Sequence, residues 1–189
     1  MAEKRVVNVE ETKGFAVRDL ILIAVLIAAG AVLKLTVSSF LTFAGMKPNF
    51  MIAMYCLAVI LTRPKVYQAG IIGLIVGLVS QIPMLNATPL VNIASELLGG
   101  LVCGILVAVF VKIAAENKAC QNVVFPAIIT FLSTVVSGYT FALIVGAGIS
   151  GVPVLAVFGM YAVMVLGTAI MNAVLAAILT PILRAVLKK

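Results

Sequence analysis

Residues 81–100 read QIPMLNATPLVNIASELLGG and carry the one acidic residue inside the hydrophobic body of the chain. That residue is Glu96, and Asn92 precedes it by one helical turn on the same face. Two glycines follow, at 99 and 100, and a polar loop with two prolines comes before. A carboxylate within an apolar run of membrane character is costly, so it is a functional-site candidate by default.

The composition indicates an integral membrane protein. The 189 residues are 64% hydrophobic and 10% charged, whereas a soluble domain is about 45–50% apolar and about 25% charged. Histidine is absent and the three cysteines share no ligand spacing, which argues against a zinc site and a disulfide framework. No GxxxxGK[ST] motif and no nucleophile–base arrangement are present. We therefore expect neither an enzyme nor a cofactor.

Six apolar runs can span a bilayer, for which about 20 residues are needed. Residues 1–16 precede them and are predicted to form a cytoplasmic tail. The second run is the shortest and could be tilted, kinked or extended by the loop before it. We predict an all-α integral membrane protein with a single domain, 17–189, of six transmembrane helices. The predicted spans are about 17–35, 50–62, 66–82, 91–114, 123–146 and 154–183.

The basic residues indicate the orientation. Of the 13 lysines and arginines, only Lys34 and Lys47 fall on one side of the predicted topology, so the other eleven fall on the opposite side. The positive-inside rule then places both termini in the cytoplasm. The net charge of +7 is thereby explained by topology rather than by nucleic-acid binding.

This topology gathers the polar side chains in the outer half of the bilayer. Glu96 lies about 8 Å below the outer edge at helical rise. Asn172 is predicted to lie too far inward for the same cavity and to serve packing. The candidate substrate-binding residues are Lys47, Asn49, Gln81, Asn86, Asn92, Glu96, Ser137 and Tyr139.

One carboxylate and one lysine facing a common cavity would suit a zwitterion, with its ammonium on Glu96 and its carboxylate on Lys47. Structural alternatives stay open. Glu96 could be a protonated carboxyl bonded by its neighbours, or Lys47 could pair with it or reach lipid headgroups. Asn92 and Gln81 could bond between helices, and Tyr139 could be an interfacial aromatic.

Small residues mark one face of the first predicted span. Ala24 and Ala28 are four residues apart, a spacing that lets membrane helices approach closely. Such a face serves either packing within the chain or docking of another membrane subunit.

Several segments resemble the bacterial tryptophan transporter family, and the layout resembles substrate-binding S components of energy-coupling factor (ECF) transporters. In that family a GMKP-type segment follows span one, a PKV turn follows span two, and a P-N-I-x-[DE]-type segment opens span four. Here Leu90 and Val91 separate Pro89 from Asn92, a departure from that pattern. The matching segments are FAGMKPNFMIAM (43–54), ILTRPKV (60–66), IIGLIVGLVSQIP (71–83) and PLVNIASELLGGL (89–101).

The resemblance implies a cell-membrane subunit that captures its substrate, tryptophan, from outside. It would work with a transmembrane T component and two cytoplasmic ATPases, toppling in the bilayer and docking through Ala24 and Ala28. The alternatives are an S component for a vitamin or related heterocycle, a solitary secondary carrier, or a non-transport scaffold in which Glu96 is structural.

Overall fold

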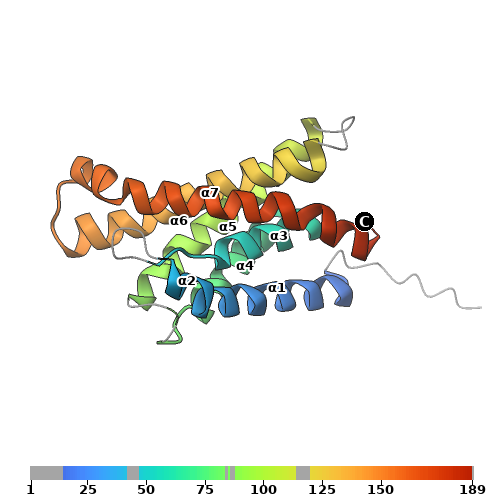
Figure 1. Ribbon diagram of the computed structural model, residues 1–189, viewed down its shortest axis with the longest axis horizontal. Helices are drawn as coiled ribbons and strands as arrows, with labels where there is room; N and C mark the ends of the chain where they lie inside the picture. The colour runs from blue at the N-terminus through green and yellow to red at the C-terminus, as the bar shows by residue number, and fades with distance from the viewer. Residues whose placement is uncertain (1–14, 42–46, 84, 86–87, 114–119, 189) are drawn as a thin grey trace, which may run out of the picture.

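The computed structural model describes residues 15–41, 47–83, 85, 88–113 and 120–188, and every regular element in these ranges is helical. Residues 1–14 of the predicted tail and Asn86 lie outside the described residues. Figure 1 shows the helices as a bundle with roughly aligned axes. In chain order they are α1 (Val17–Leu35), α2 (Val37–Phe40), α3 (Met51–Thr62), α4 (Val66–Val79), α5 (Pro89–Ile113), η1 (Cys120–Val124), α6 (Phe125–Ala142), η2 (Leu143–Ile149) and α7 (Val154–Leu187).

Each of the six predicted spans corresponds to a helix. Three helical stretches are long and apolar enough to cross a membrane: 24 residues of α5, 30 residues from η1 through η2, and the 34 residues of α7. The fifth span is longer than predicted because the π-helical turns η1 and η2 extend α6 at both ends. The third span ends earlier, at Val79, because residues 80–83 form a turn. The all-helical class and the set of six helices are confirmed.

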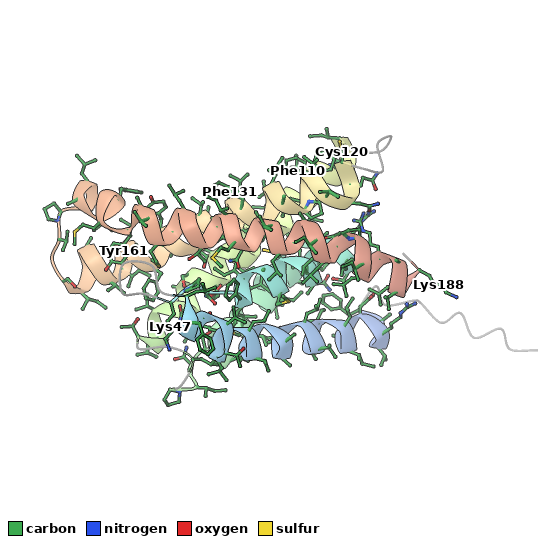
Figure 2. All side chains as sticks on the ribbon, viewed as in Figure 1. Lys47, Phe110, Cys120, Phe131, Tyr161 and Lys188 are labelled. Carbon is green, nitrogen blue, oxygen red and sulfur yellow. The ribbon has the colours of Figure 1, made fainter. Side chains whose placement is uncertain are left out.

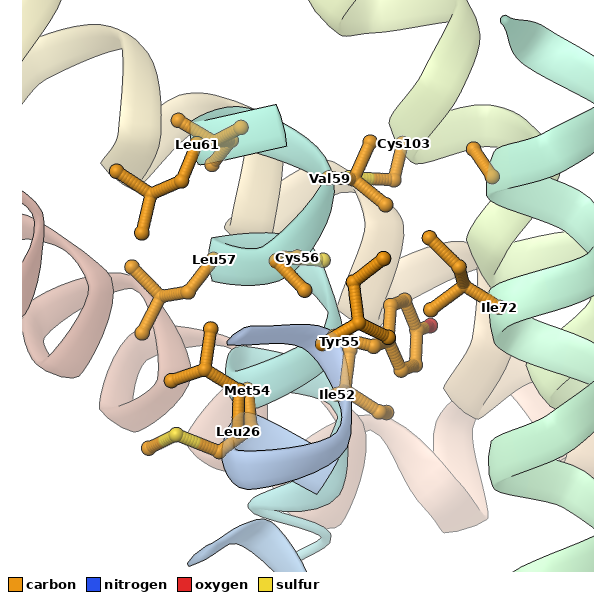
Figure 3. Packing of buried hydrophobic residues seen from close by; sticks show 14 of the residues in the cluster. Leu26, Ile52, Met54, Tyr55, Cys56, Leu57, Val59, Leu61, Ile72 and Cys103 are labelled. Carbon is orange, nitrogen blue, oxygen red and sulfur yellow. The ribbon is translucent and has the colours of Figure 1, made fainter. Parts of the chain in front are cut away.

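The short second span, α3, is the centre of the bundle. All eleven residues from Met51 to Leu61 are buried, and α3 contacts α1, α4, α5, α6 and α7. Figure 3 shows its side chains, Tyr55 and Leu57 among them, packed against neighbouring helices. Its 12 residues rise only about 18 Å, against a hydrocarbon core of about 30 Å. Because protein surrounds α3, its length need not match the bilayer.

Helices α4 and α5 pack backbone against backbone. A Cβ added to Gly100 would lie 2.6 Å from the carbonyl oxygen of Ala69, and one added to Gly77 would lie 2.8 Å from the Cα of Ile93. Gly73 lies directly against the carbonyl oxygen of Glu96. Small residues permit this approach in a membrane bundle, so the α4–α5 contact fixes the position of Glu96.

The start of α1 and the end of α7 lie at the same end of the bundle (Figure 1). The Nη2 of Arg18 donates a 2.7 Å hydrogen bond to the carbonyl oxygen of Leu187. Figure 2 places Lys188 at this end and Lys47 toward the other. Which end faces the cytoplasm remains the prediction made from the basic residues.

Candidate functional site

A cavity of about 480 Å³ opens in the half of the bundle that holds Lys47. This volume falls within the range of about 300–1,000 Å³ usual for small-molecule sites. The first turns of α3 and α5, the end of α1, the loop before α5, and the helices α6 and α7 contribute to its wall. Its polar lining is Lys34, Lys47, Asn49, Thr88, Asn92, Ser95, Thr134, Ser137 and Thr168, and its other lining is Ile52, Pro83, Leu85, Gly138, Phe141, Val145, Met164 and Val165.

Four of the predicted site residues line this cavity: Lys47, Asn49, Asn92 and Ser137. They come from the connection before α3, from α5 and from α6, segments far apart in the sequence. Their convergence supports the predicted gathering of polar groups in one half of the bundle.

Two predicted residues point elsewhere. The Nε2 of Gln81, in the turn after α4, donates a 2.7 Å hydrogen bond to the carbonyl oxygen of Gly77 in the last turn of that helix. The hydroxyl of Tyr139 donates a 3.4 Å bond to the carbonyl oxygen of Phe158, and the two rings lie 4.9 Å apart. Neither Gln81 nor Tyr139 belongs to the cavity lining.

Glu96 lies behind the cavity wall and is fully buried. The Nδ2 of Asn49 donates to its Oε1 at 2.5 Å, and the hydroxyl of Ser137 donates to its Oε2 at 3.3 Å. The Oδ1 of Asn49 accepts a 3.3 Å bond from the backbone N–H of Met51. A molecule in the cavity therefore meets Asn49 and Ser137 first, with the carboxylate one layer behind them.

Asn172 is hydrogen-bonded to two residues of the cavity lining. Its Nδ2 donates to the carbonyl oxygen of Asn49 at 3.0 Å and to the Oγ1 of Thr134 at 3.2 Å. Asn49 lies just before the short helix α3 and is therefore deep enough in the bundle to meet the middle of α7. Asn172 does not itself line the cavity, but both of its hydrogen-bond partners, Asn49 and Thr134, do.

Lys34 is a cavity residue that sequence reasoning assigned to topology alone. It lies in the last turn of α1, is 8% exposed, lines the cavity and interacts electrostatically with Glu96. Its position inside the apolar run AAGAVLKL was the available signal. The cavity therefore contains two lysines rather than one.

Two threonines of the cavity lining, Thr134 and Thr168, were also missed. Thr134 lies one turn before the predicted Ser137 on α6, and Thr168 lies one turn before Asn172 on α7. All four are buried. Their helical spacing within apolar runs was the signal that could have identified a polar face.

Two cavity-lining polar atoms have no hydrogen-bond partner among the described residues. They are the Nδ2 of Asn92 and the Oγ1 of Thr168, whose side chains are 4% exposed. A buried polar group without a partner costs about 1–3 kcal/mol, so these atoms are suited to meet a ligand or water. In the same described ranges, no three His, Cys, Asp or Glu side chains come together to hold a metal ion.

Comparison with known proteins gives the family. The chain is 27% identical over 176 residues to a "Probable tryptophan transport protein" of Bacillus subtilis (strain 168), which covers 91% of this chain and 94% of that protein. No solved structure matches the present chain significantly. The family described as "Tryptophan transporter TrpP" matches residues 16–188, which include every helix and the whole cavity. The chain is therefore a multi-pass protein of the cell membrane and belongs to the TrpP tryptophan transporter family.

Proposed function

We propose that this protein takes up tryptophan, unchanged, through the cell membrane and binds it in the cavity between α1, α3, α5, α6 and α7. The observation that carries the proposal is a cavity of suitable size that combines two lysines, unpartnered polar atoms and an apolar wall. The family and the name of its Bacillus subtilis relative support tryptophan as the substrate.

The carboxylate of the substrate would bind between Lys34 and Lys47. Both lysines line the cavity, and no acidic side chain does so among the described residues. The Nδ2 of Asn92 supplies a further donor. Hydrogen bonds to charged groups contribute about 1.5–3 kcal/mol each, so this end would supply much of the affinity.

The ammonium would bind at Ser137, with Glu96 behind it. Because the hydroxyl proton of Ser137 is donated to Glu96, its oxygen can act only as an acceptor toward the cavity. The negative charge of Glu96 would favour a cation at that oxygen. This arrangement retains the predicted zwitterion recognition but makes the contact with Glu96 indirect.

The indole ring would pack against Phe141, Met164 and Val165 on the apolar side of the cavity. Aromatic rings favour such surfaces, and a buried indole N–H usually finds an acceptor. The unpartnered Oγ1 of Thr168 lies on the same helix as Met164 and would accept that hydrogen bond.

Ligand fluorescence tests this binding directly, since the chain contains no tryptophan of its own. Purified protein is titrated with tryptophan, and the change in indole emission gives Kd. We expect Lys34→Gln and Lys47→Gln each to weaken binding about 10- to 100-fold, from the loss of about 1.5–3 kcal/mol. Lys112→Gln, outside the cavity, is the matched control and should leave Kd unchanged.

Unaltered affinity in both cavity variants would refute the site. If the purified protein retained a vitamin in place of tryptophan, the cavity would still be the binding site but the substrate would be that vitamin.

For the mechanism, we propose that the protein is the substrate-binding S component of an ECF-type transporter, with a T component and two ATPases as partners and both termini in the cytoplasm. Helix α1 lies at one side of the bundle, where α3 is its main contact. Ala24 and Ala28 are both exposed on it, which leaves a small-residue surface for another membrane helix.

Co-purification with the T component and ATPases tests this mechanism. Ala24→Trp and Ala28→Trp should abolish the complex but leave tryptophan binding intact. Ala29→Trp is the matched control because Ala29 is exposed on the same helix but lies about 100° around it from Ala28. Tryptophan uptake into vesicles that contain this protein alone would instead establish a secondary carrier.

A further inference from the structure

A second cavity, of about 170 Å³, lies at the opposite end of the bundle from the proposed tryptophan site. It is formed where α3 and α5 end, where α6 begins and where α7 approaches its last turn. Two arginines, Arg63 and Arg184, share its wall with an apolar floor that includes Ile60, Phe110 and Phe125. We call it the arginine pocket.

Arg184 is half-buried and has only neutral partners in the described structure. Its Nη1 donates to the carbonyl oxygen of Gln121 at 3.1 Å and to the Oδ1 of Asn122 at 2.6 Å. The positive charge of Arg63 acts on it with like sign. The described acidic residues, Asp19 and Glu96, do not line the pocket. Two cations thus face one cavity without a carboxylate from the described chain.

Arg63 occupies a backbone position that favours glycine. It ends α3 with φ 47° and ψ 55°, and its N–H donates to the carbonyl oxygen of Val59 at 2.8 Å. Helices often end in this left-handed conformation, usually with glycine, because a Cβ is unfavourable there. An arginine at this position therefore adds a guanidinium to the pocket at some cost in backbone energy.

We propose that the arginine pocket binds the phosphate of an anionic phospholipid headgroup. Guanidinium groups match phosphate oxygens with paired hydrogen bonds, and basic pockets between membrane helices bind such headgroups. The volume is below the usual range of about 300–1,000 Å³ for a whole small molecule, which suits one group of a larger ligand.

The apolar floor favours a lipid over free phosphate as the source of that group. The rings of Phe110 and Phe125 lie 4.9 Å apart and line the pocket together with Val111, which is 42% exposed. A free phosphate would gain nothing from these surfaces, whereas the glycerol and acyl chains of a lipid would pack on them.

Lipid retention by purified protein tests the proposal. The protein is incubated with equal amounts of phosphatidylglycerol and phosphatidylcholine, and the bound lipid is measured by native mass spectrometry. We expect phosphatidylglycerol to be preferred. Arg63→Gly should reduce that affinity about 5-fold, the equivalent of about 1 kcal/mol for one basic residue near the membrane surface.

One feature of this test excludes a folding artefact, and another excludes a general effect of charge. Glycine suits the backbone angles of Arg63, so Arg63→Gly should fold and bind tryptophan with unchanged Kd. Lys65→Gln, two residues on and outside the pocket, is the matched control for general charge and should retain the lipid preference.

Loss of preference in Arg63→Gly but not in Lys65→Gln supports the pocket. Equal retention of the two lipids, or equal loss in the two variants, overturns it. Displacement of bound phosphatidylglycerol by inorganic phosphate supports the phosphate chemistry. Phosphate binding without any lipid preference refutes the lipid source.

Discussion

The proposed relay from Glu96 through Ser137 predicts that the two side chains act as one unit in tryptophan binding. Glu96→Gln keeps the shape but removes the charge, and Ser137→Ala removes the oxygen that faces the cavity. Since hydrogen bonds to charged groups contribute about 1.5–3 kcal/mol, each single variant should weaken binding about 10- to 100-fold. The Ser137–Glu96 distance of 3.3 Å is long for an O–H···O bond, so we expect the lower part of that range.

The double variant separates the relay from independent effects. If Glu96 acts through Ser137, the double variant should bind tryptophan as well as the single variant with the lower affinity. The two substitutions would then have a coupling energy of at least about 1 kcal/mol. Binding is measured by the fluorescence of bound tryptophan, with thermal unfolding in detergent as the check on folding. Tyr139→Phe is the matched control because Tyr139 bonds Phe158 and does not line the cavity.

Additive effects of the two substitutions, within about 0.5 kcal/mol, would refute the relay. An unchanged Kd in Glu96→Gln would show instead that Glu96 is structural.

Two further predictions concern packing, and thermal unfolding in detergent measures both. Gly73→Ala would drive its Cβ into the carbonyl oxygen of Glu96 and should lower the free energy of unfolding by about 1–3 kcal/mol. Gly159→Ala is the control, because nothing lies within 4 Å of the added Cβ, and it should be neutral or stabilising. Equal stability of the two variants would contradict the close contact of α4 and α5. Leu57, in α3, is 0% exposed, so Leu57→Ala should lower the free energy of unfolding by about 2–5 kcal/mol. Leu155 is 86% exposed, so Leu155→Ala should lower it far less. An unchanged stability in Leu57→Ala would argue against a central position of α3.

Composition and the length of the apolar runs were sufficient to predict the membrane class and the six helices. Apolar surface is unfavourable in water, and backbone groups without hydrogen bonds are unfavourable in lipid, so few structures other than membrane helices are open to such a sequence. The same reasoning identified four residues of the cavity lining: Asn92 and Ser137, which are polar residues within apolar runs, and Lys47 and Asn49, which directly precede the second run. It also identified the second run as short, but it did not explain how so short a helix fits in a membrane bundle.

The tertiary structure decided which side chains face the cavity. Most of these helices are apolar on all sides, so the sequence does not show which face of a helix meets its neighbours. Only packing placed α3 at the centre, set Glu96 behind Asn49 and Ser137, and brought Asn172 to them. Packing also turned Lys34 into the cavity and left Gln81 and Tyr139 out of it. The spacing of residues along the chain sets depth in the membrane, but the rotation of each helix about its axis is set by its contacts.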